Sequence, residues 1–366
     1  MIRTEEMLLN VGPQHPSTHG VFRLIIKIDG EIITEAKPVI GYLHRGTEKL
    51  AENLQYTQII PYTDRMDYVS AMTTNYVFCH AVETMSGVEV PERADYIRVI
   101  AMELGRIASH LVWFGTFLLD LGAVSPFLFA FRERETILNF LNELSGARLT
   151  FNYMRVGGVK WDVPEGWLDK VKDFIPYMRE QLAGYHNLAI GNEIVQSRLK
   201  GIGEYTQEEA IAYSLSGANL RCTGINSDVR KVKSYSVYDR FDFKAAVRTE
   251  GDTWSRLECR IEEISESLKI IEQAIGQFPS CGEILGKVPK IIKTPPGETY
   301  VSIESPRGEI GCYIASDGKK EPYRLKFRRP SFHNLQILPK LLIGQNISNL
   351  IVILGAIDII LGEVDG

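Results

Sequence analysis

Residues 91–122 of the chain read PERADYIRVIAMELGRIASHLVWFGTFLLDLG and have the apolar spacing of one long helix. Pro91 stands near the start of this stretch, where a helix loses little from the missing N–H group. Glu103, Arg106 and His110 follow at intervals of three and four residues, so a helix would carry all three on one face. The pattern predicts a mostly buried helix with one polar stripe.

The rest of the chain reads as helices in the middle and strands toward the two ends. Residues 21–28 and 31–39 flank Asp29-Gly30, a strong hairpin signal. Helical periodicity predicts helices at roughly 47–57, 67–86, 92–122, 127–145, 165–190, 206–214 and 252–277, the last with one face in solvent. Strands return over 298–331, with turns at Pro306-Arg307-Gly308 and Asp317-Gly318, and apolar helices follow to the end.

These segments predict an α+β fold, with a large central helical bundle and small N-terminal and C-terminal β-containing regions. A chain of 366 residues is long enough for two or three packed units. We expect an N-terminal β-hairpin region at 1–45, a helical bundle domain at 46–295 and a C-terminal α+β region at 296–366.

The composition is that of an ordinary globular protein, with 45% hydrophobic residues, 24% charged residues and a net charge of −5. This charge gives no reason to expect nucleic acid as a partner. The five cysteines are scattered and include no Cys-x-x-Cys pair. We therefore expect no disulfide framework, and no iron–sulfur cluster or zinc site held by this chain alone.

One stretch approaches the length of a membrane span. Residues 111–131 are apolar over about the 20 residues that a span needs, but they include Asp120, Gly122 and Pro126. We expect two buried helices that meet at Ser125-Pro126, and no transmembrane helix in this chain. The first residues also lack the apolar core of a signal peptide. Attachment to a membrane would then depend on partner subunits.

Two motifs near the start of the chain have the composition of a binding site. The first, GPQHPSTHG, covers residues 12–20, and the second, PYTDRMDY, covers residues 61–68. Proline and glycine set the turns of the first loop, which therefore has a defined shape and holds its polar groups outward. Histidine and tyrosine side chains donate hydrogen bonds and can be reprotonated, as acid–base chemistry requires.

Further strings place the chain beside a known family. They are GYLHRGTEK at 41–49, ELGRIASH at 103–110, LLDLGA at 118–123, FRERE at 131–135, YMRVGGV at 153–159, ESPRGE at 304–309 and GEVD at 362–365. With the two motifs above, and in the same order, they resemble the D-subunit family of the respiratory NADH-quinone oxidoreductase, complex I. That family is related to the large subunit of nickel-iron hydrogenases, so the resemblance implies a hydrogenase large-subunit-like fold.

The resemblance implies a peripheral-arm subunit of a proton-pumping enzyme that helps form the quinone-reduction site and couples electron transfer to proton translocation. Quinone would be the substrate, and this chain alone would hold no cofactor. FMN and iron–sulfur clusters would lie in other peripheral-arm subunits, including a cluster-bearing neighbour. Membrane-arm subunits would be further partners, with the chain attached peripherally to the cytoplasmic side of the cell membrane.

The resemblance also implies the residues of the site. His19 and Tyr68 match the two side chains that bracket the quinone headgroup in the family. Asp120 matches a carboxylate beside that histidine, where it would orient the ring and favour the imidazolium. The alternatives are that Tyr68 is a core tyrosine at a helix start and that Asp120 is a helix N-cap.

A second set of residues is a candidate coupling or structural ion network. Arg45 and Glu48 belong to an Arg-Gly-x-Glu string shared with hydrogenase large subunits. Glu103, Arg106 and His110 form the polar stripe, and charges on a buried helix must pair. The stripe is either a structural ion network or a charge relay that responds to quinone reduction, and both interpretations stay open.

Hydrogenase large subunits bind nickel and iron through two Cys-x-x-Cys pairs. The matching positions of this chain hold Asp67, Ser70, Ile360 and Glu363. Such a metal site requires soft thiolate ligands, so we expect no metal here. The vacated cavity becomes a candidate position for a quinone headgroup.

Two rival functions remain. The chain could belong to a related quinone reductase that receives electrons from ferredoxin or another donor, or it could be a non-catalytic scaffold for assembly. The presence of His19, Tyr68 and Asp120 argues against the scaffold. The sequence names neither the electron donor nor the quinone.

Overall fold

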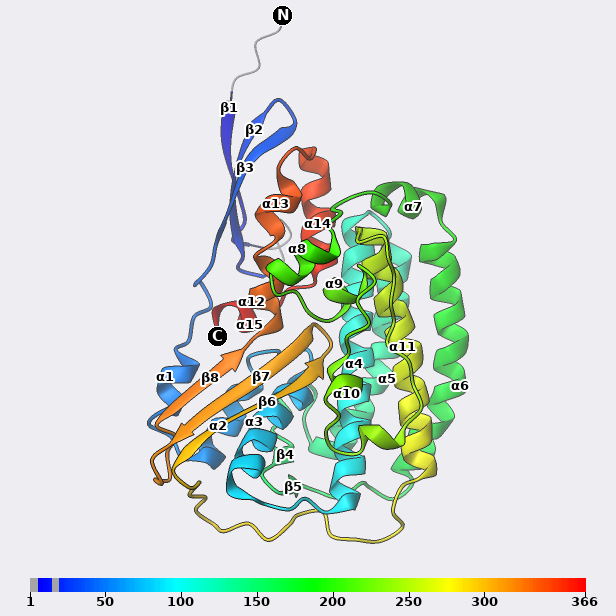
Figure 1. The fold of residues 1–366 in the computed structure, drawn as a ribbon. Coiled ribbons are helices and arrows are strands. Elements are labelled where there is room, and N and C mark those ends of the chain that lie inside the picture. Colours follow the sequence, from blue (N-terminus) through cyan, green and yellow to red (C-terminus); the bar gives the residue numbers. More distant parts are fainter. Residues whose placement is uncertain (1–5, 15–19) are drawn as a thin grey trace, which may run out of the picture.

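The computed structural model describes residues 6–14 and 20–366 and confirms the predicted α+β class. Long helices form one side of the molecule, and two three-stranded antiparallel sheets lie on the other (Figure 1). The α-helices are α1 Thr47–Ala51, α2 Tyr56–Thr63, α3 Ala71–Ser86, α4 Glu92–Asp120, α5 Val124–Ser145, α6 Trp167–Tyr185, α7 Glu193–Leu199, α8 Gln207–Ala212, α9 Ala218–Arg221, α10 Val229–Val232, α11 Thr253–Gly276, α12 Pro330–Leu335, α13 Leu338–Leu342, α14 Leu350–Ile357 and α15 Leu361–Asp365. The strands are β1 Glu6–Val11, β2 Arg23–Asp29, β3 Ile32–Val39, β4 Met154–Arg155, β5 Gly158–Val159, β6 Gly297–Ser305, β7 Gly308–Ser316 and β8 Arg324–Arg328.

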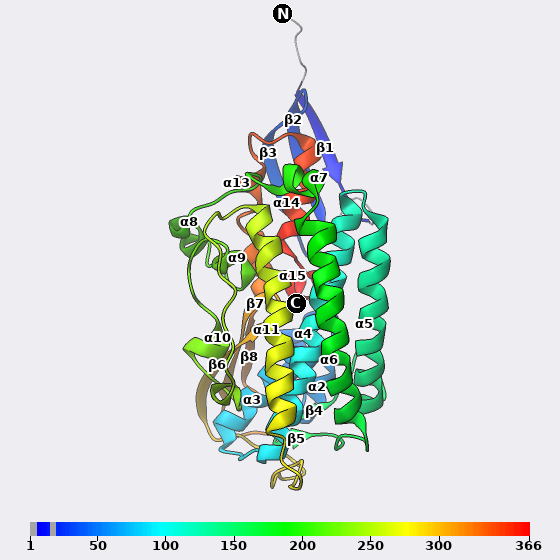
Figure 2. The same cartoon turned by 90° about the vertical axis from the view of Figure 1, so that its right-hand side faces the viewer.

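Helix α4 is the centre of the bundle. Helices α5 and α11 pack against it, with α6 alongside them (Figure 2). Most side chains of α4 between Ala94 and Leu118 are buried, as the apolar pattern predicts. The indole N–H of Trp113 donates a 2.7 Å hydrogen bond to the carbonyl oxygen of Gly355, which ties α4 to α14. The ends of α4 and α14 are therefore held together near the C-terminal segment.

One turn of the sheet β6-β7-β8 is important for the site. Strands β6 and β7 are paired up to Ser305 and Gly308, so Pro306 and Arg307 alone connect them. One face of the sheet packs on α3. The side chain of Arg307 is almost fully buried among the helices rather than projecting into solvent, as a charged residue in a tight turn normally does.

The C-terminal segment returns to residues near the start of the chain. The carboxylate of Asp365 accepts hydrogen bonds from the backbone N–H groups of Gly41 (2.7 Å) and Leu43 (2.6 Å). A Cβ atom on Gly362 would lie 2.4 Å from the carbonyl oxygen of Met66 and 2.6 Å from that of Arg65. Helix α15 therefore packs directly on the backbone between α2 and α3.

Two clusters of buried apolar side chains form the core. One joins the long helices to α2, α3 and the strands β6, β7 and β8, and the other joins β2 and β3 to α8, α9 and α12–α15. The first cluster includes side chains on both sides of residue 295. The proposed boundaries after residues 45 and 295 therefore stay a prediction about the organisation of the chain.

One local prediction is wrong. Helix α4 ends at Asp120 and α5 begins at Val124, so the two helices meet at residues 121–123, and Pro126 lies in the first turn of α5. Proline fits there because the first N–H groups of a helix have no partner within it. Helix α11 has the predicted partly exposed face, at Glu258, Glu262, Ser265, Lys269 and Glu272, but its other faces also bury charged residues, among them Arg256, Arg260 and Glu263. Periodicity marks charged positions but does not show whether an opposite charge faces them.

The structure also bears on membrane attachment. No helix in the described part of the chain combines the length and hydropathy that a membrane crossing needs.

Asp64, at the end of α2, is fully buried and accepts a 3.2 Å hydrogen bond from the backbone N–H of Asn152. Among the described residues, the other carboxylate oxygen of Asp64 and the side-chain oxygen of Asn75 have no hydrogen-bond partner. A proton on Asp64 would supply a donor there.

This acid predicts a pH-dependent stability. Burial raises the pKa of Asp64 to about 6, although hydrogen bonds from Asn152 and Asn75 oppose the rise. The folded chain therefore binds more protons than the unfolded chain between about pH 4 and 6, and stability falls as pH rises through that window. We expect Asp64→Asn to remove this fall and to stabilise the chain at pH 7.5 by up to about 2–3 kcal/mol, but not at pH 4.

Denaturant unfolding at several pH values measures this effect. Asp173→Asn is the control, because Asp173 is exposed on α6 and should leave the pH dependence of the wild-type chain intact. Equal pH dependence in wild type and Asp64→Asn would contradict the assignment.

Candidate functional site

Tyr68 lies in the segment between α2 and α3, and its ring lines a cavity of about 370 Å³. Its side chain is 36% exposed, and α3 begins only at Ala71. Tyr68 is therefore not a core tyrosine at a helix start. Burial raises the pKa of its phenol, and the negative charge of Asp67 adds to the rise. Tyr68 thus keeps its proton at neutral pH and can donate a hydrogen bond into the cavity.

The walls of this cavity are mostly apolar and come from both ends of the chain. The apolar side chains include Val112, Trp113, Phe131, Leu149, Leu354, Ile360 and Leu361, and the polar ones are Tyr68, Thr116, Arg134, Arg307 and Asp358. A concave apolar site with a few polar groups is the usual form of a small-molecule site. Apolar walls would hold a flat ring, and the polar groups would act on its oxygens.

The predicted site residue His19 lies outside the described residues. Gly20, the residue directly after it, lines the cavity, and its Cα region faces the side chain of Leu361. The first motif therefore ends at the same cavity that the second motif lines with Tyr68. Two segments some fifty residues apart in the sequence meet at one place.

Asp120 is the last residue of α4, one turn beyond Thr116 in the cavity wall. It is exposed and engaged with other groups. It is not an N-cap, which corrects that alternative. A carboxylate at the C-terminal end of a helix is opposed by the helix dipole, so helix formation does not account for its position.

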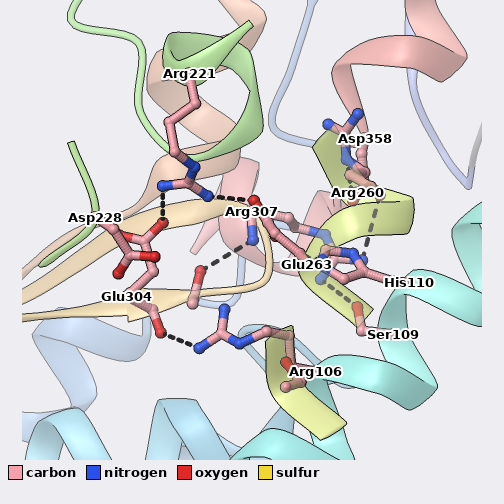
Figure 3. Close-up of polar contacts among 12 residues, drawn as sticks. Arg106, Ser109, His110, Arg221, Asp228, Arg260, Glu263, Glu304, Arg307 and Asp358 are labelled. Atoms are coloured by element: carbon pink, nitrogen blue, oxygen red, sulfur yellow. Dashed lines mark hydrogen bonds and ion pairs between the residues drawn. The ribbon is translucent and has the colours of Figure 1, made fainter. Parts of the chain in front are cut away.

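Behind the cavity, Arg307 is held by groups from three other segments. Its guanidinium donates to the carboxylate of Asp67 (2.7 Å), to the hydroxyl of Ser109 on α4 (3.0 Å) and to the carboxylate of Asp358 after α14 (3.3 Å). Asp358 also pairs with Arg260 of α11 at 3.7 Å. Figure 3 shows Arg307 together with Ser109, Asp358 and Arg260.

The four residues that the sequence resemblance matched to hydrogenase cysteines, Asp67, Ser70, Ile360 and Glu363, lie in this region. Asp67 contacts Arg307, and Ile360 lines the cavity. Glu363 is fully buried, and its side chain accepts a 3.1 Å hydrogen bond from the backbone N–H of Ser331. Ser70 is buried and donates to the hydroxyl of Thr73. The structure thus brings the two sequence pairs together with oxygen and apolar side chains in place of thiolates.

The polar stripe of α4 enters a buried ion network. His110 is 2.8 Å from the carboxylate of Glu263 on α11, and the other oxygen of Glu263 accepts from Arg221. Arg221 also donates to Glu304 on β6 at 2.7 Å, and the backbone carbonyl of Glu304 accepts from Arg106 at 2.8 Å. Figure 3 shows this sequence of contacts. Arg260, which pairs with Asp358, and Glu263 lie three residues apart on one face of α11, so this ion network lies beside the residues that surround Arg307.

Glu103 is the other end of this network. It contacts Arg106 and Arg230 at 3.2 and 3.1 Å, and it accepts hydrogen bonds from Tyr238 and Ser267, both at 2.6 Å. Burial alone would raise the pKa of Glu103, but the two arginines lower it to about 2. Glu103 is therefore a fully charged and fully paired carboxylate at neutral pH. Burial lowers the pKa of His110, against the influence of Glu263.

Arg45 and Glu48 do not contact this buried network. Glu48 accepts a 3.0 Å hydrogen bond from the backbone N–H of Phe327 and lies 3.4 Å from Arg324 and Lys326, so it anchors α1 to β8. Arg45 is exposed and lines a small surface cavity with Tyr62 and Arg65. The five residues of the predicted network therefore separate into two sets. Arg45 and Glu48 lie apart from the network, whereas Glu103, Arg106 and His110 form a buried stripe.

Several residues of the site were not singled out from the sequence. Arg221, Arg230, Glu263 and Asp358 belong to no quoted motif, and Arg307 was noted only as part of a turn and of the family string at 304–309, with no role of its own. One signal was available: Arg256, Arg260 and Glu263 are spaced for one face of a helix. No group of three or more histidine, cysteine or acidic residues in the described ranges is arranged to hold a metal ion.

Comparison with known proteins identifies the family. The model of the family described as "Respiratory-chain NADH dehydrogenase, 49 Kd subunit" matches residues 120–293 and 286–366. Proteins of Bacillus anthracis and Bacillus cereus, each named as the D subunit of NADH-quinone oxidoreductase, are 78% identical over 366 residues, with 100% of both chains covered. The corresponding protein of Geobacillus thermodenitrificans is 77% identical over the same length. The chain belongs to this family of oxidoreductase subunits, as the sequence motifs predicted.

The packing of α15 on residues 65 and 66 predicts a sensitive glycine. Gly362→Ala must push α15 away from the segment that carries Tyr68, because the backbone there cannot give way like a side-chain tip. Overpacking of this kind costs about 1–3 kcal/mol. We expect a lower melting temperature and a higher KM for quinone in the assembled enzyme.

Gly105→Ala is the matched control. Gly105 is also buried, but a Cβ atom there would meet nothing within 4 Å. Alanine favours a helix over glycine by about 0.5–1 kcal/mol, so this variant should be at least as stable as wild type. Equal losses in the two variants would disprove the role given to the close contact of α15.

Proposed function

We propose that this chain forms the quinone-reduction site of a proton-pumping NADH-quinone oxidoreductase. The observation that carries the proposal is the apolar cavity lined by Tyr68, with the guanidinium of Arg307 at its back. The 78% identical relatives are named as a subunit of NADH-quinone oxidoreductase, which supports the same reaction. In this reaction a quinone takes up two electrons and two protons.

The residues of the cavity suit each part of that chemistry. Trp113, Phe131 and Leu354 would enclose the ring of the quinone and exclude water. Tyr68 would donate to a quinone carbonyl, where negative charge develops as electrons arrive, and then give up its proton. Arg307 places a positive charge at the back of the same cavity, which stabilises that negative charge most effectively where water is absent.

His19 and Asp120 complete the proposed site. His19 would donate to the opposite carbonyl of the quinone, since Gly20 beside it lines the cavity. Asp120, one turn from the cavity wall, would orient the His19 ring and favour its charged form. A carboxylate at the C-terminal end of α4 has an electrostatic cost, which this role would explain.

The remaining groups of the reaction belong to partners. Electrons would arrive from an iron–sulfur cluster in a neighbouring peripheral-arm subunit, and FMN would lie further along the electron path. Quinones are dissolved in the membrane, so the cavity would open toward membrane-arm subunits. The chain would lie on the cytoplasmic side of the cell membrane. The contacts of the buried stripe from His110 to Glu103 are compatible with both interpretations, a structural ion network and a charge relay.

Two alternatives can be distinguished by experiment. A complex fed by ferredoxin or another donor would reduce quinone without NADH, so the purified complex should be assayed with each donor. A non-catalytic scaffold would tolerate changes at Tyr68 without loss of activity. Residues from each of the three predicted regions, 1–45, 46–295 and 296–366, line the cavity, so all three would contribute to the proposed function.

Tyr68→Phe is the central test of the proposed function. The change keeps the ring and removes only the hydroxyl, so the complex should assemble while quinone reduction falls by about 10²–10³, the usual loss for one such donor. Tyr323→Phe is the control, because Tyr323 is 72% exposed and outside the cavity. NADH oxidation with a native-length quinone measures both variants. Wild-type turnover in Tyr68→Phe would refute the proposed site.

Asp120→Asn tests the proposed coupling. The change keeps the shape and removes the charge, which should lower quinone reduction and proton translocation together. It should also lower the pKa of His19 and move the corresponding limb of the pH profile to lower pH. Both rates in membrane vesicles across pH provide the measurement, with Asp173→Asn on exposed α6 as the control. Full activity with an unmoved profile would leave Asp120 without a coupling role.

A further inference from the structure

The group around Arg307 contains more acids than bases. Its carboxyl groups are Asp67, Asp358 and Glu363, and its guanidinium groups are Arg307 and Arg260. Burying an uncompensated charge is costly, and such a site commonly takes up a proton instead. One carboxyl group of the three is therefore expected to be neutral at physiological pH.

The contacts of the three acids single out Glu363. Asp67 and Asp358 each contact Arg307, whereas no arginine is in hydrogen-bond contact with Glu363 among the described residues. One oxygen of Glu363 accepts from the backbone N–H and the hydroxyl of Ser331. The other oxygen is buried and has no hydrogen-bond partner in the described part of the chain. A proton on that oxygen would remove an uncompensated charge.

The fold also places Glu363 beside Asp67. Gly362 packs against the backbone of residues 65 and 66, which brings the buried side chains of Glu363 and Asp67 into the same region, close enough for their charges to interact. Burial and the negative charge of Asp67 raise the pKa of Glu363 to about 7, against the opposing influence of Arg307 and Ser331. Burial likewise raises the pKa of Asp67, and Asp358 adds to that rise against Arg307. The two acids are thus coupled, and one of them lies next to Tyr68 in the sequence.

We propose that Glu363 holds a proton behind the quinone cavity and returns it, by way of Asp67, to Tyr68 after Tyr68 has protonated the reduced quinone. The proposal rests on the proposed function and assigns the next step of the same site. Glu363 does not touch the quinone, so it is a proton-holding residue rather than a catalytic one.

This step accounts for one of the two protons that the reduced quinone gains, and its bonds balance. The partner redox centre supplies the electrons, and the O–H bond of Tyr68 breaks as a new O–H bond forms on the quinone. The proton of Glu363 then moves to Asp67, and the proton of Asp67 moves to the Tyr68 oxygen. Glu363 is left as a carboxylate until it takes a proton from solvent. Arg307, between the acids and the cavity, stabilises the anions that form in passing.

Glu363→Gln in the complete membrane complex tests the proposal. Glutamine imitates the protonated acid in shape but cannot release a proton. We expect kcat to fall by about 10²-fold or more, with KM for quinone unchanged, as is usual for loss of a proton-transfer group. In wild type, kcat should decline on the alkaline side as Glu363 loses its proton. That alkaline decline should be absent in Glu363→Gln.

Glu83→Gln is the matched control for a structural effect. Glu83 is a buried glutamate that pairs with Arg98 at 2.6 Å, away from the cavity. Its loss should reduce stability while leaving the shape of the pH profile unchanged. Wild-type kcat and profile in Glu363→Gln would overturn the proposal. So would a loss of activity with an unchanged profile, which is the effect expected of Glu83→Gln.

Ser331→Ala provides a second, milder test that does not depend on Glu363→Gln assembling. Ser331 donates its hydroxyl to the carboxylate of Glu363, so its removal disfavours the charged form. The alkaline decline of kcat should move to higher pH, and an unmoved decline would overturn the proposal. Tyr68→Phe distinguishes failure of the proposed function from failure of the proton-holding step. Full activity in Tyr68→Phe would refute the proposed function. Full activity in Glu363→Gln together with an inactive Tyr68→Phe would refute only the proton-holding step.

Discussion

The structure depends on one buried cation, the guanidinium of Arg307. It lies in a two-residue connection between strands, yet it is 2% exposed and touches Asp67, Ser109 and Asp358. A buried guanidinium without carboxylate partners would be strongly unfavourable, so these segments must meet around it. The β6–β7 turn, the loop before α3, helix α4 and the end of α14 are thereby fixed relative to one another. The cavity that Tyr68 lines is the space left in front of that junction.

The same junction links the cavity to the ion network of the bundle. Asp358 pairs with Arg260, which lies one turn from Glu263 on α11, and Glu263 contacts both His110 and Arg221. Each of these charged groups has an opposite partner, so a change of charge at the cavity would alter the field on the next pair. Buried ion pairs are not in general a source of net stability compared with apolar packing. A large paired network beside an apolar cavity is therefore consistent with a role in the reaction as well as in the fold.

The resemblance to hydrogenases that the sequence suggested would have a simple physical form in this chain. The segment around residues 67–70 and the segment around 360–363 lie together, held by the contact of Gly362 with the backbone of residues 65 and 66. Thiolates at these positions would bind a metal, but this chain has acids, a serine and an isoleucine there. Acids without a metal need arginines, backbone donors or protons. Asp67 pairs with Arg307, and Glu363 has Ser331 and one oxygen without a partner among the described residues.

Local patterns in the sequence were enough to predict the α+β class, the long helix at 92–120 and the motif that carries Tyr68, because periodicity and Pro/Gly turns are local properties of the chain. They also identified the family, since motifs are read in order along the chain. Which charges are buried and paired emerged from the three-dimensional packing. That packing joined Glu103, Arg106 and His110 to Arg221, Glu263 and Glu304, and it separated Arg45 and Glu48 from them. The partner of a buried charge lies as far as 240 residues away, as for Arg307 and Asp67, and no local pattern specifies such a contact.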